Sequence, residues 1–302
     1  MIAWAHGTTG IVRGCAPSIL KKGLDAGALP VLSQVIARGW VLVATDYIGL
    51  GTKGPHPYLI GQGEARSVLD SVRAAMQMKQ LELANRIVVW GHSQGGHAAL
   101  WTGIVAPSYA PQLNIVGVAA LAPASDLTGL LPNLGNLTGG EIFASYVIGA
   151  YSENYGDVGF DTYVRPQTRI IVRSVASRCL AEPAVLVSVL TSLPLKSSIL
   201  GTKASTGALG QRLHENTPAG HIDAPLLIAQ GEADSLVRPA VQARFVKTLC
   251  AAGQSLQYRV YPGRDHLGVV ADDSPLIPEL LSWTEHRIQG RTEPPGCRRF
   301  TG

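Results

Sequence analysis

A serine between glycines stands where a strand is predicted to turn into a helix. Residues 91–95 read Gly-His-Ser-Gln-Gly and fit G-x-S-x-G, the nucleophile elbow, which makes Ser93 the candidate nucleophile. A serine on so sharp a turn takes a strained backbone conformation, and a Cβ two residues before or after it would clash. The apolar run 87–89 and the helix formers at 98–100 predict the flanking strand and helix. The alternative is a chance match, because the chain contains 34 glycines.

The serine hydroxyl needs a base to accept its proton, and the sequence offers a histidine and several carboxylates. His266 follows a predicted strand in a loop of Gly and Asp residues and is the predicted base. Asp234, after the preceding predicted strand, is predicted to hold the imidazole in one tautomer and to stabilise the imidazolium. Glu232 and Asp126 are alternative partners, whereas Asp265 is adjacent to the histidine and would point elsewhere.

Two backbone N–H groups are predicted to bind the oxyanion that forms during acyl transfer. One belongs to Gln94, at the helix start after the elbow, where the helix dipole favours negative charge. The second is expected from Thr8, with Thr9 as the next choice, in the glycine-rich turn after the first strand. His6 is expected to brace that turn. Packing, pocket or unassigned roles are expected for His56, His92, His97, His214, His221 and His286.

The elements that would position these groups alternate between strand and helix. Apolar runs predict strands at 2–6, 40–45, 87–90, 114–121, 224–231 and 255–261. Helical patterns cover 64–83, the segment from the elbow to about 105, 239–252 and 275–288. Such alternation predicts an α/β fold with a mostly parallel sheet and helices on both faces. The candidates follow the strands in the order Ser, Asp, His, as in α/β-hydrolases.

A segment without strand signals interrupts the alternation. Residues 127–217 are rich in Leu, Gly, Ser and Thr, with helical patches at 141–150 and 183–193. We predict an inserted helical subdomain here, within a core formed by 1–126 and 218–302. The alternative is a pair of ordinary helices packed on the sheet.

Composition excludes several other classes of function. Hydrophobic residues make up 46% and charged residues 15% of the 302, which suggests much buried surface or an apolar binding face. The net charge of +4 comes from scattered residues, so we expect no nucleic-acid partner. No uncharged apolar run reaches the roughly 18 residues of a transmembrane helix. The predicted chemistry requires no cofactor and no metal ion.

Four cysteines, at positions 15, 179, 250 and 297, lack the C-x-x-C spacing of a structural zinc site. Their even number allows two disulfides in three connectivities, and four buried thiols remain the alternative.

The chain resembles the secretory lipase family of α/β-hydrolases, which includes yeast lipase A and bacterial relatives. The matching motifs extend over nearly the whole chain: Ala5-His6-Gly7-Thr8-Thr9-Gly10, Cys15-Ala16-Pro17-Ser18, Thr45-Asp46-Tyr47, Gly49-Leu50-Gly51, Gly91-His92-Ser93-Gln94-Gly95-Gly96, Gln230, Gly231 and Asp234, Tyr261-Pro262-Gly263 and His266. The resemblance implies carboxylic-ester hydrolysis, a helical lid between the fourth and fifth strands, and a triad of Ser93, Asp234 and His266. It also implies disulfides joining Cys15 to Cys179 and Cys250 to Cys297, and therefore an exported protein.

The sequence departs from that family at its start. Such hydrolases usually carry two or more strands before the one that ends at His6, and here the sequence begins with that strand. Strand 40–45 would then be an exposed sheet edge. We expect either that N-terminal strands and a signal peptide precede the given sequence, or that a partner chain covers this edge.

The sequence is compatible with three functions. The first is an esterase or lipase that acts on acyl esters or acylglycerols, with possible contact to a lipid–water interface through the lightly charged segment 127–217. The second is an acyltransferase that uses the same triad with an alcohol acceptor. The third, a non-catalytic hydrolase-like binding module, is disfavoured because such modules usually lose a triad member.

Overall fold

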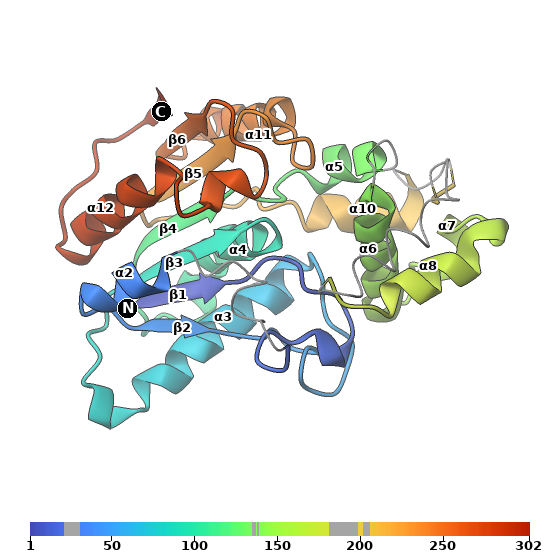
Figure 1. The fold of residues 1–302 in the computed structure, drawn as a ribbon, viewed down its shortest axis with the longest axis horizontal. Coiled ribbons are helices and arrows are strands. Elements are labelled where there is room, and N and C mark those ends of the chain that lie inside the picture. Colours follow the sequence, from blue (N-terminus) through green and yellow to red (C-terminus); the bar gives the residue numbers. More distant parts are fainter. Residues whose placement is uncertain (21–30, 135–136, 138, 181–198, 202–205) are drawn as a thin grey trace.

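The chain forms one parallel seven-stranded sheet with helices on both faces (Figure 1). The computed structural model describes residues 1–20, 31–134, 137, 139–180, 199–201 and 206–302. The strand order is β2-β1-β3-β4-β5-β6-β7, and every neighbouring pair is parallel. The strands are β1 Ile2–Ala5, β2 Leu42–Ala44, β3 Ile87–His92, β4 Ile115–Leu121, β5 Leu226–Gly231, β6 Leu256–Tyr261 and β7 Cys297–Thr301. The predicted α/β architecture is therefore confirmed.

The central strands are apolar throughout because both of their faces are covered. In β3, Val89 faces the apolar core formed with α3 (Gly61–Met76), α4 (Gln94–Tyr109) and α11 (Pro239–Ala251). Its neighbours Val88 and Trp90 face the opposite core, formed with α2 (Leu32–Ala37) and α12 (Leu276–Ile288). Alternate side chains thus anchor each strand in both layers, and the carboxyl ends of the strands are held in fixed relative positions.

Several element boundaries differ from the expectations. The helix expected at 64–83 begins at Gly61, ends at Met76 and is followed by a 3₁₀ turn at Lys79–Leu81. The strand expected at 40–45 is shortened to Leu42–Ala44 and lies at one edge of the sheet. Strand β7, at the other edge, was not expected, because Cys-Arg-Arg-Phe-Thr contains no apolar run and its side chains are mostly exposed.

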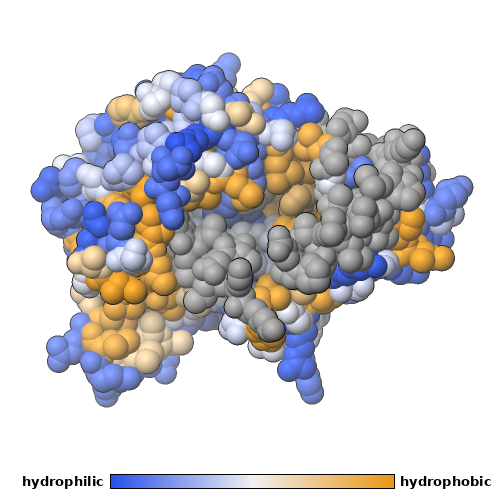
Figure 2. All heavy atoms as spheres, in the orientation of Figure 1, coloured by the Kyte–Doolittle hydropathy of each residue, from blue (hydrophilic) through white to orange (hydrophobic). Residues whose placement is uncertain are grey.

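The described helices in 127–217 pack around a separate apolar cluster (Figure 1). They are α5 Leu127–Leu134, α6 Gly140–Asn154, α7 Phe160–Tyr163, α8 Arg169–Ala176 and α10 Gly207–Glu215. Residues outside this segment also contribute to the cluster, namely Ile11, Tyr58, Leu59, Ala124 and Val237. The space-filling view shows apolar side chains gathered near α5, where these helices meet the core (Figure 2). The helical patch expected at 183–193 lies outside the described residues.

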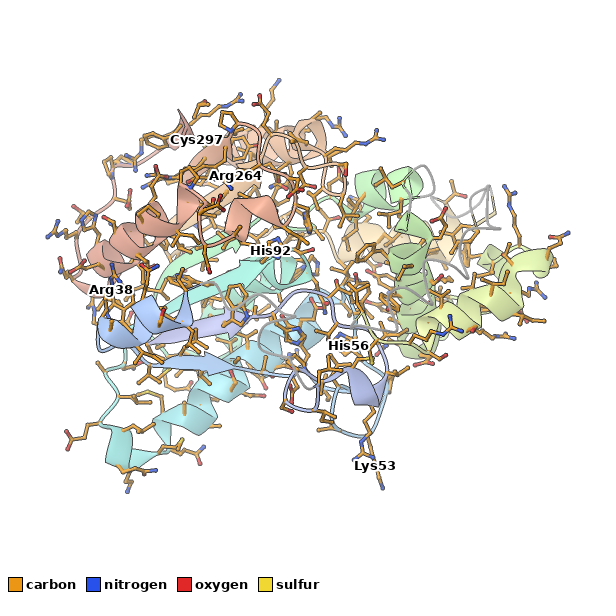
Figure 3. All side chains as sticks on the ribbon, viewed as in Figure 1. Arg38, Lys53, His56, His92, Arg264 and Cys297 are labelled. Carbon is orange, nitrogen blue, oxygen red and sulfur yellow. A yellow bond between two sulfur atoms is a disulfide. The ribbon has the colours of Figure 1, made fainter. Side chains whose placement is uncertain are left out.

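Two disulfides join distant parts of the chain. Cys15, after β1, is bonded to Cys179 in the helical segment, and Cys250 on α11 is bonded to Cys297 on β7. Cys297 is labelled in Figure 3. A backbone hydrogen bond from Leu180 N to Thr9 O, at 2.7 Å, runs beside the first disulfide. The turn after β1 is therefore fixed to the helical segment. None of the helices in the described ranges has the length and apolar character to cross a membrane.

Candidate active site

Ser93 occupies the sharp turn between β3 and α4 with φ = 58° and ψ = −118°, a conformation that non-glycine residues rarely adopt. A Cβ on Gly91 would overlap the carbonyl of Gly95, and one on Gly95 would overlap the carbonyl of Ala5 in β1. The turn is held by the hydrogen bond from Ser93 N to Leu121 O at 2.9 Å. The glycines thus allow the backbone contacts that keep the serine in its strained conformation.

The side chains of Ser93, His266 and Asp234 form a hydrogen-bonded chain. Ser93 Oγ lies 2.8 Å from His266 Nε2, and His266 Nδ1 lies 2.8 Å from Asp234 Oδ2. With a neutral imidazole, Nδ1–H donates to the carboxylate and Nε2 accepts the serine proton. This is the arrangement that proton transfer from serine to histidine requires.

The loop after β5 holds the Asp234 carboxylate by donors alone. Oδ1 accepts from the backbone N–H groups of Leu236 (2.9 Å) and Val237 (2.8 Å), and Oδ2 also accepts from Gln230 Nε2 (3.0 Å). Gly231 allows this loop to approach the loop that carries His266. A Cβ on Gly231 would overlap the carbonyl of Arg264, two residues before His266. The carboxylate is buried, yet both its oxygens are satisfied.

The alternative carboxylates lie elsewhere. Glu232 is exposed, Asp126 Oδ1 accepts from Gly129 N at the start of α5, and Asp265 Oδ1 accepts from Gly268 N. The carboxylate that His266 Nδ1 contacts is that of Asp234.

His92 holds the backbone of His266 by a hydrogen bond, although a packing or pocket role was expected from the sequence. Its Nε2 lies 2.8 Å from His266 O, so Nε2 carries the proton, and the two rings are 4.8 Å apart. Burial and the nearby His266 ring lower the pKa of His92 to about 3, which keeps it neutral. Figure 3 shows His92 at the carboxyl end of β3, directed toward the loop that carries His266.

The two predicted oxyanion donors come from different strands. Gln94 N–H is in the first turn of α4, and Thr8 N–H is in the turn after β1. Within the described part of the chain, neither N–H has an acceptor. Thr8 Oγ1 lies 3.0 Å from Tyr58 OH, and burial raises the pKa of Tyr58, so the phenol stays neutral. His6 braces the same turn: its ring lies 4.4 Å from that of Tyr47, which donates to His6 O.

A narrow apolar cavity opens next to Ser93. It encloses about 30 Å³ of free space, room for no more than a few water molecules. Its lining comes from both sides of the site and consists of Tyr58, Leu59, Ser93, Gln94, Ala124, Leu127, Leu130, Leu131, Leu134, Phe143, Val147, Leu213, Leu236 and Val237. An acyl chain fits this lining chemically, because the walls beyond the nucleophile are apolar.

A group of buried polar side chains beside Ser93 was not predicted from the sequence. Glu64 on α3 contacts Gln94 and His97 on α4, and His56 contacts Gln94. A signal was present: Glu64 is in register with Val68 and Val72 on the buried face of α3, where an unpaired carboxylate would be costly. Across the described residues, no group of three His, Cys, Asp or Glu could hold a metal ion.

The family model described as secretory lipase matches residues 25–296. This chain belongs to the secretory lipase family. Relatives in that family include Lipase 6 of Candida albicans, 23% identical over 94% of this chain, and Lipase A of Moesziomyces aphidis, 27% identical over 88%. The chain spans 64% and 60% of their respective lengths.

Solved structures support the α/β-hydrolase fold. Candida antarctica lipase A superposes with a TM-score of 0.83 at 21% identity, over 100% of this chain and 73% of that one. The rice cell wall degrading esterase LipA from Xanthomonas oryzae gives a TM-score of 0.73 at 20% identity, over 96% and 80% of the two chains.

Proposed function

We propose that the protein is a serine carboxylic-ester hydrolase that acts on acyl esters or acylglycerols. The observation that carries this proposal is the hydrogen-bonded chain from Ser93 Oγ through His266 to Asp234, with both links at 2.8 Å. Membership of the secretory lipase family supports it independently. The relatives described above are named lipases or esterases, so water is the acyl acceptor that we propose.

In the proposed mechanism, Ser93 Oγ attacks the ester carbonyl as its proton passes to His266 Nε2. Asp234 stabilises the imidazolium that results. The negative charge on the former carbonyl oxygen is bound by the N–H groups of Gln94 and Thr8. His266 then protonates the leaving alcohol, and a water activated by the same imidazole hydrolyses the acyl-enzyme.

The apolar cavity is the proposed site for the acyl group, and segment 127–217 the proposed lid over a core formed by 1–126 and 218–302. Helices α5 and α6 of that segment supply Leu130 and Phe143 to the cavity, which supports the division. On α8, Ile170 is 84% exposed and lies next in sequence to Arg169, which supports contact with a lipid–water interface. Because the free space is only about 30 Å³, short acyl chains are expected to react faster than long ones.

We propose that the protein is secreted. Two disulfides persist best outside reducing compartments, and the related proteins include secreted triacylglycerol lipases of Malassezia globosa.

The test is hydrolysis of p-nitrophenyl esters from acetate to palmitate by wild type and Ser93→Ala. Loss of the nucleophile should lower kcat by at least about 10⁴-fold. Ser108→Ala is the matched control, because that exposed serine lies on the same helix and bonds only Val105 O. Undiminished turnover by Ser93→Ala would refute the proposal, and a preference for palmitate would refute the assignment of the short acyl site.

A further inference from the structure

A buried polar group beside the nucleophile, here called the Glu64 cluster, connects α3, α4 and the end of α10. It consists of Glu64, Gln94, His97, His56 and Asn216. The side chains of Glu64 and His97 are both 0% exposed. Figure 3 shows His56 on the side of the core that faces the helical segment.

The Glu64 carboxylate is fully engaged. Oε1 accepts from Gln94 Nε2 at 2.7 Å and from Leu59 N at 2.9 Å, and Oε2 lies 3.0 Å from His97 Nδ1. His97 Nε2 donates to Asn216 O at 2.8 Å. A single oxygen of Glu64 therefore joins the first residue of α4 to the loop before α3.

The hydrogen bonds from Gln94 and Leu59 to Glu64 Oε1 connect this carboxylate to both proposed oxyanion donors. Gln94 supplies one N–H itself. Leu59 follows Tyr58, whose hydroxyl bonds Thr8 Oγ1 at 3.0 Å, and Thr8 supplies the other N–H. We propose that Glu64 is a positioning residue that sets the relative placement of the two oxyanion donors. This inference rests on the proposed ester hydrolysis, since its effect is exerted on the transition state.

Two features, one in the Glu64 cluster and one at Leu59 beside it, are unfavourable in energy and so point to a role beyond stability. Leu59 has φ = 53°, a left-handed conformation that is costly for leucine, and it is held by Glu64 on its N–H and by Tyr151 on its carbonyl. Gln94 Oε1 is buried and has no partner among the described residues. The Gln94 amide thus contributes hydrogen bonds only through its N–H donors. A strained backbone such as that of Leu59, and an unsatisfied polar atom such as Gln94 Oε1, are typical of functional sites.

The expected results separate positioning from simple packing. Glu64→Leu removes the hydrogen bonds to both Gln94 and Leu59, and we expect kcat to fall about 100-fold while KM changes less than about threefold, because oxyanion donors act on the transition state. Glu64→Gln can still accept from Leu59 and Gln94 and donate to His97 Nδ1, so it should recover most of that loss. Gln94→Leu keeps the backbone donor but loses the anchor, and should lower kcat about tenfold.

Thr284→Val is the matched control for loss of a buried hydrogen bond. Trp90 Nε1 donates to Thr284 Oγ1 at 2.9 Å on the opposite face of the sheet. This variant should lower Tm and leave kcat of the folded enzyme unchanged. All rates are normalised to active sites titrated with a fluorophosphonate and measured well below each Tm.

The inference is overturned if folded Glu64→Leu and Gln94→Leu keep kcat within about threefold of wild type, or if Glu64→Gln is no better than Glu64→Leu. Should Glu64→Leu fail to fold, the Gln94→Leu and Glu64→Gln rates decide by themselves: a tenfold loss in the first and near-retention in the second support positioning, and any other pair of results overturns it. A wild type without Ser93-dependent hydrolysis would instead refute the proposed function.

Discussion

Two buried carboxylates, Asp234 and Glu64, lie on either side of the proposed nucleophile Ser93, and their surroundings are almost the same. Asp234 and Glu64 each face the Nδ1 of a histidine, at 2.8 and 3.0 Å, and each accepts from a glutamine Nε2. In both glutamines, Gln230 and Gln94, the amide oxygen is buried without a partner in the described structure. Each carboxylate also accepts from the backbone, Asp234 from two N–H groups and Glu64 from one.

The two histidines differ in the group that faces their Nε2 atom. His266 Nε2 faces the hydroxyl of Ser93, which has a proton to give, whereas His97 Nε2 faces the carbonyl of Asn216, which has none. The His266 side chain is 13% exposed and that of His97 is 0% exposed. A buried carboxylate–histidine pair is therefore not a catalytic signature, because the group that follows the imidazole decides whether a proton can move.

The largest expected effect comes from the same isosteric change at both carboxylates. In Asp234→Asn the amide donates to His266 Nδ1, which forces the proton onto Nε2 and leaves no acceptor for Ser93. We expect kcat to fall about 10⁴-fold. In Glu64→Gln the amide donates to His97 Nδ1 and leaves Nε2–H to donate to Asn216 O, so every hydrogen bond of the ring keeps a partner and the loss should be small. Steady-state ester hydrolysis measures both variants. A similar fall in kcat for Asp234→Asn and Glu64→Gln would show that the two carboxylates do not differ in role.

The next effect concerns two buried histidines, His92 on the acid–base side and His56 on the oxyanion side. Burial is the main cause that lowers the pKa of each from 6.5 to about 3. Between those values the unfolded state binds more protons, so the free energy of unfolding falls as the pH falls. From pH 7.5 to 5.5 we expect a loss of about 1.4 kcal/mol for each histidine, or about 3 kcal/mol together.

Urea unfolding of wild type, His92→Asn and His56→Asn at the two pH values measures this loss. Each variant should show a smaller pH dependence than wild type by about 1.4 kcal/mol. Equal dependence in all three proteins would show that these rings are not the groups that titrate.

The smallest effect is expected for Tyr58→Phe, which removes one neutral hydrogen bond to Thr8. Such a bond contributes about 1 kcal/mol, so kcat should fall about fivefold with KM little changed. Single-turnover acylation of the variant would locate the loss in the oxyanion step. Full activity would mean that the Thr8 turn is held by its other contacts, among them Leu180 N to Thr9 O.

Much of the fold could be predicted because the central strands carry apolar runs that only a doubly covered sheet requires. Strand β7 could not, since an edge strand with a half-buried Arg298 and an exposed Arg299 has no such pattern. Ser93, Asp234 and His266 could be proposed because parallel strands bring their carboxyl ends together. The Glu64 cluster escaped prediction because its members come from four separate segments, and only packing shows which of them meet.

Each disulfide closes part of the chain into a covalent ring. The three proposed catalytic residues are divided between the two rings and the segment that connects them. The ring closed by Cys15 and Cys179 contains Ser93, and the ring closed by Cys250 and Cys297 contains His266. Asp234 lies in the connecting segment between them. A single backbone cleavage inside either ring would leave the fragments covalently joined, so a protease that nicks these loops cannot by itself release the nucleophile or the base from the molecule. A cut between the rings, near Asp234, is the one that would separate them.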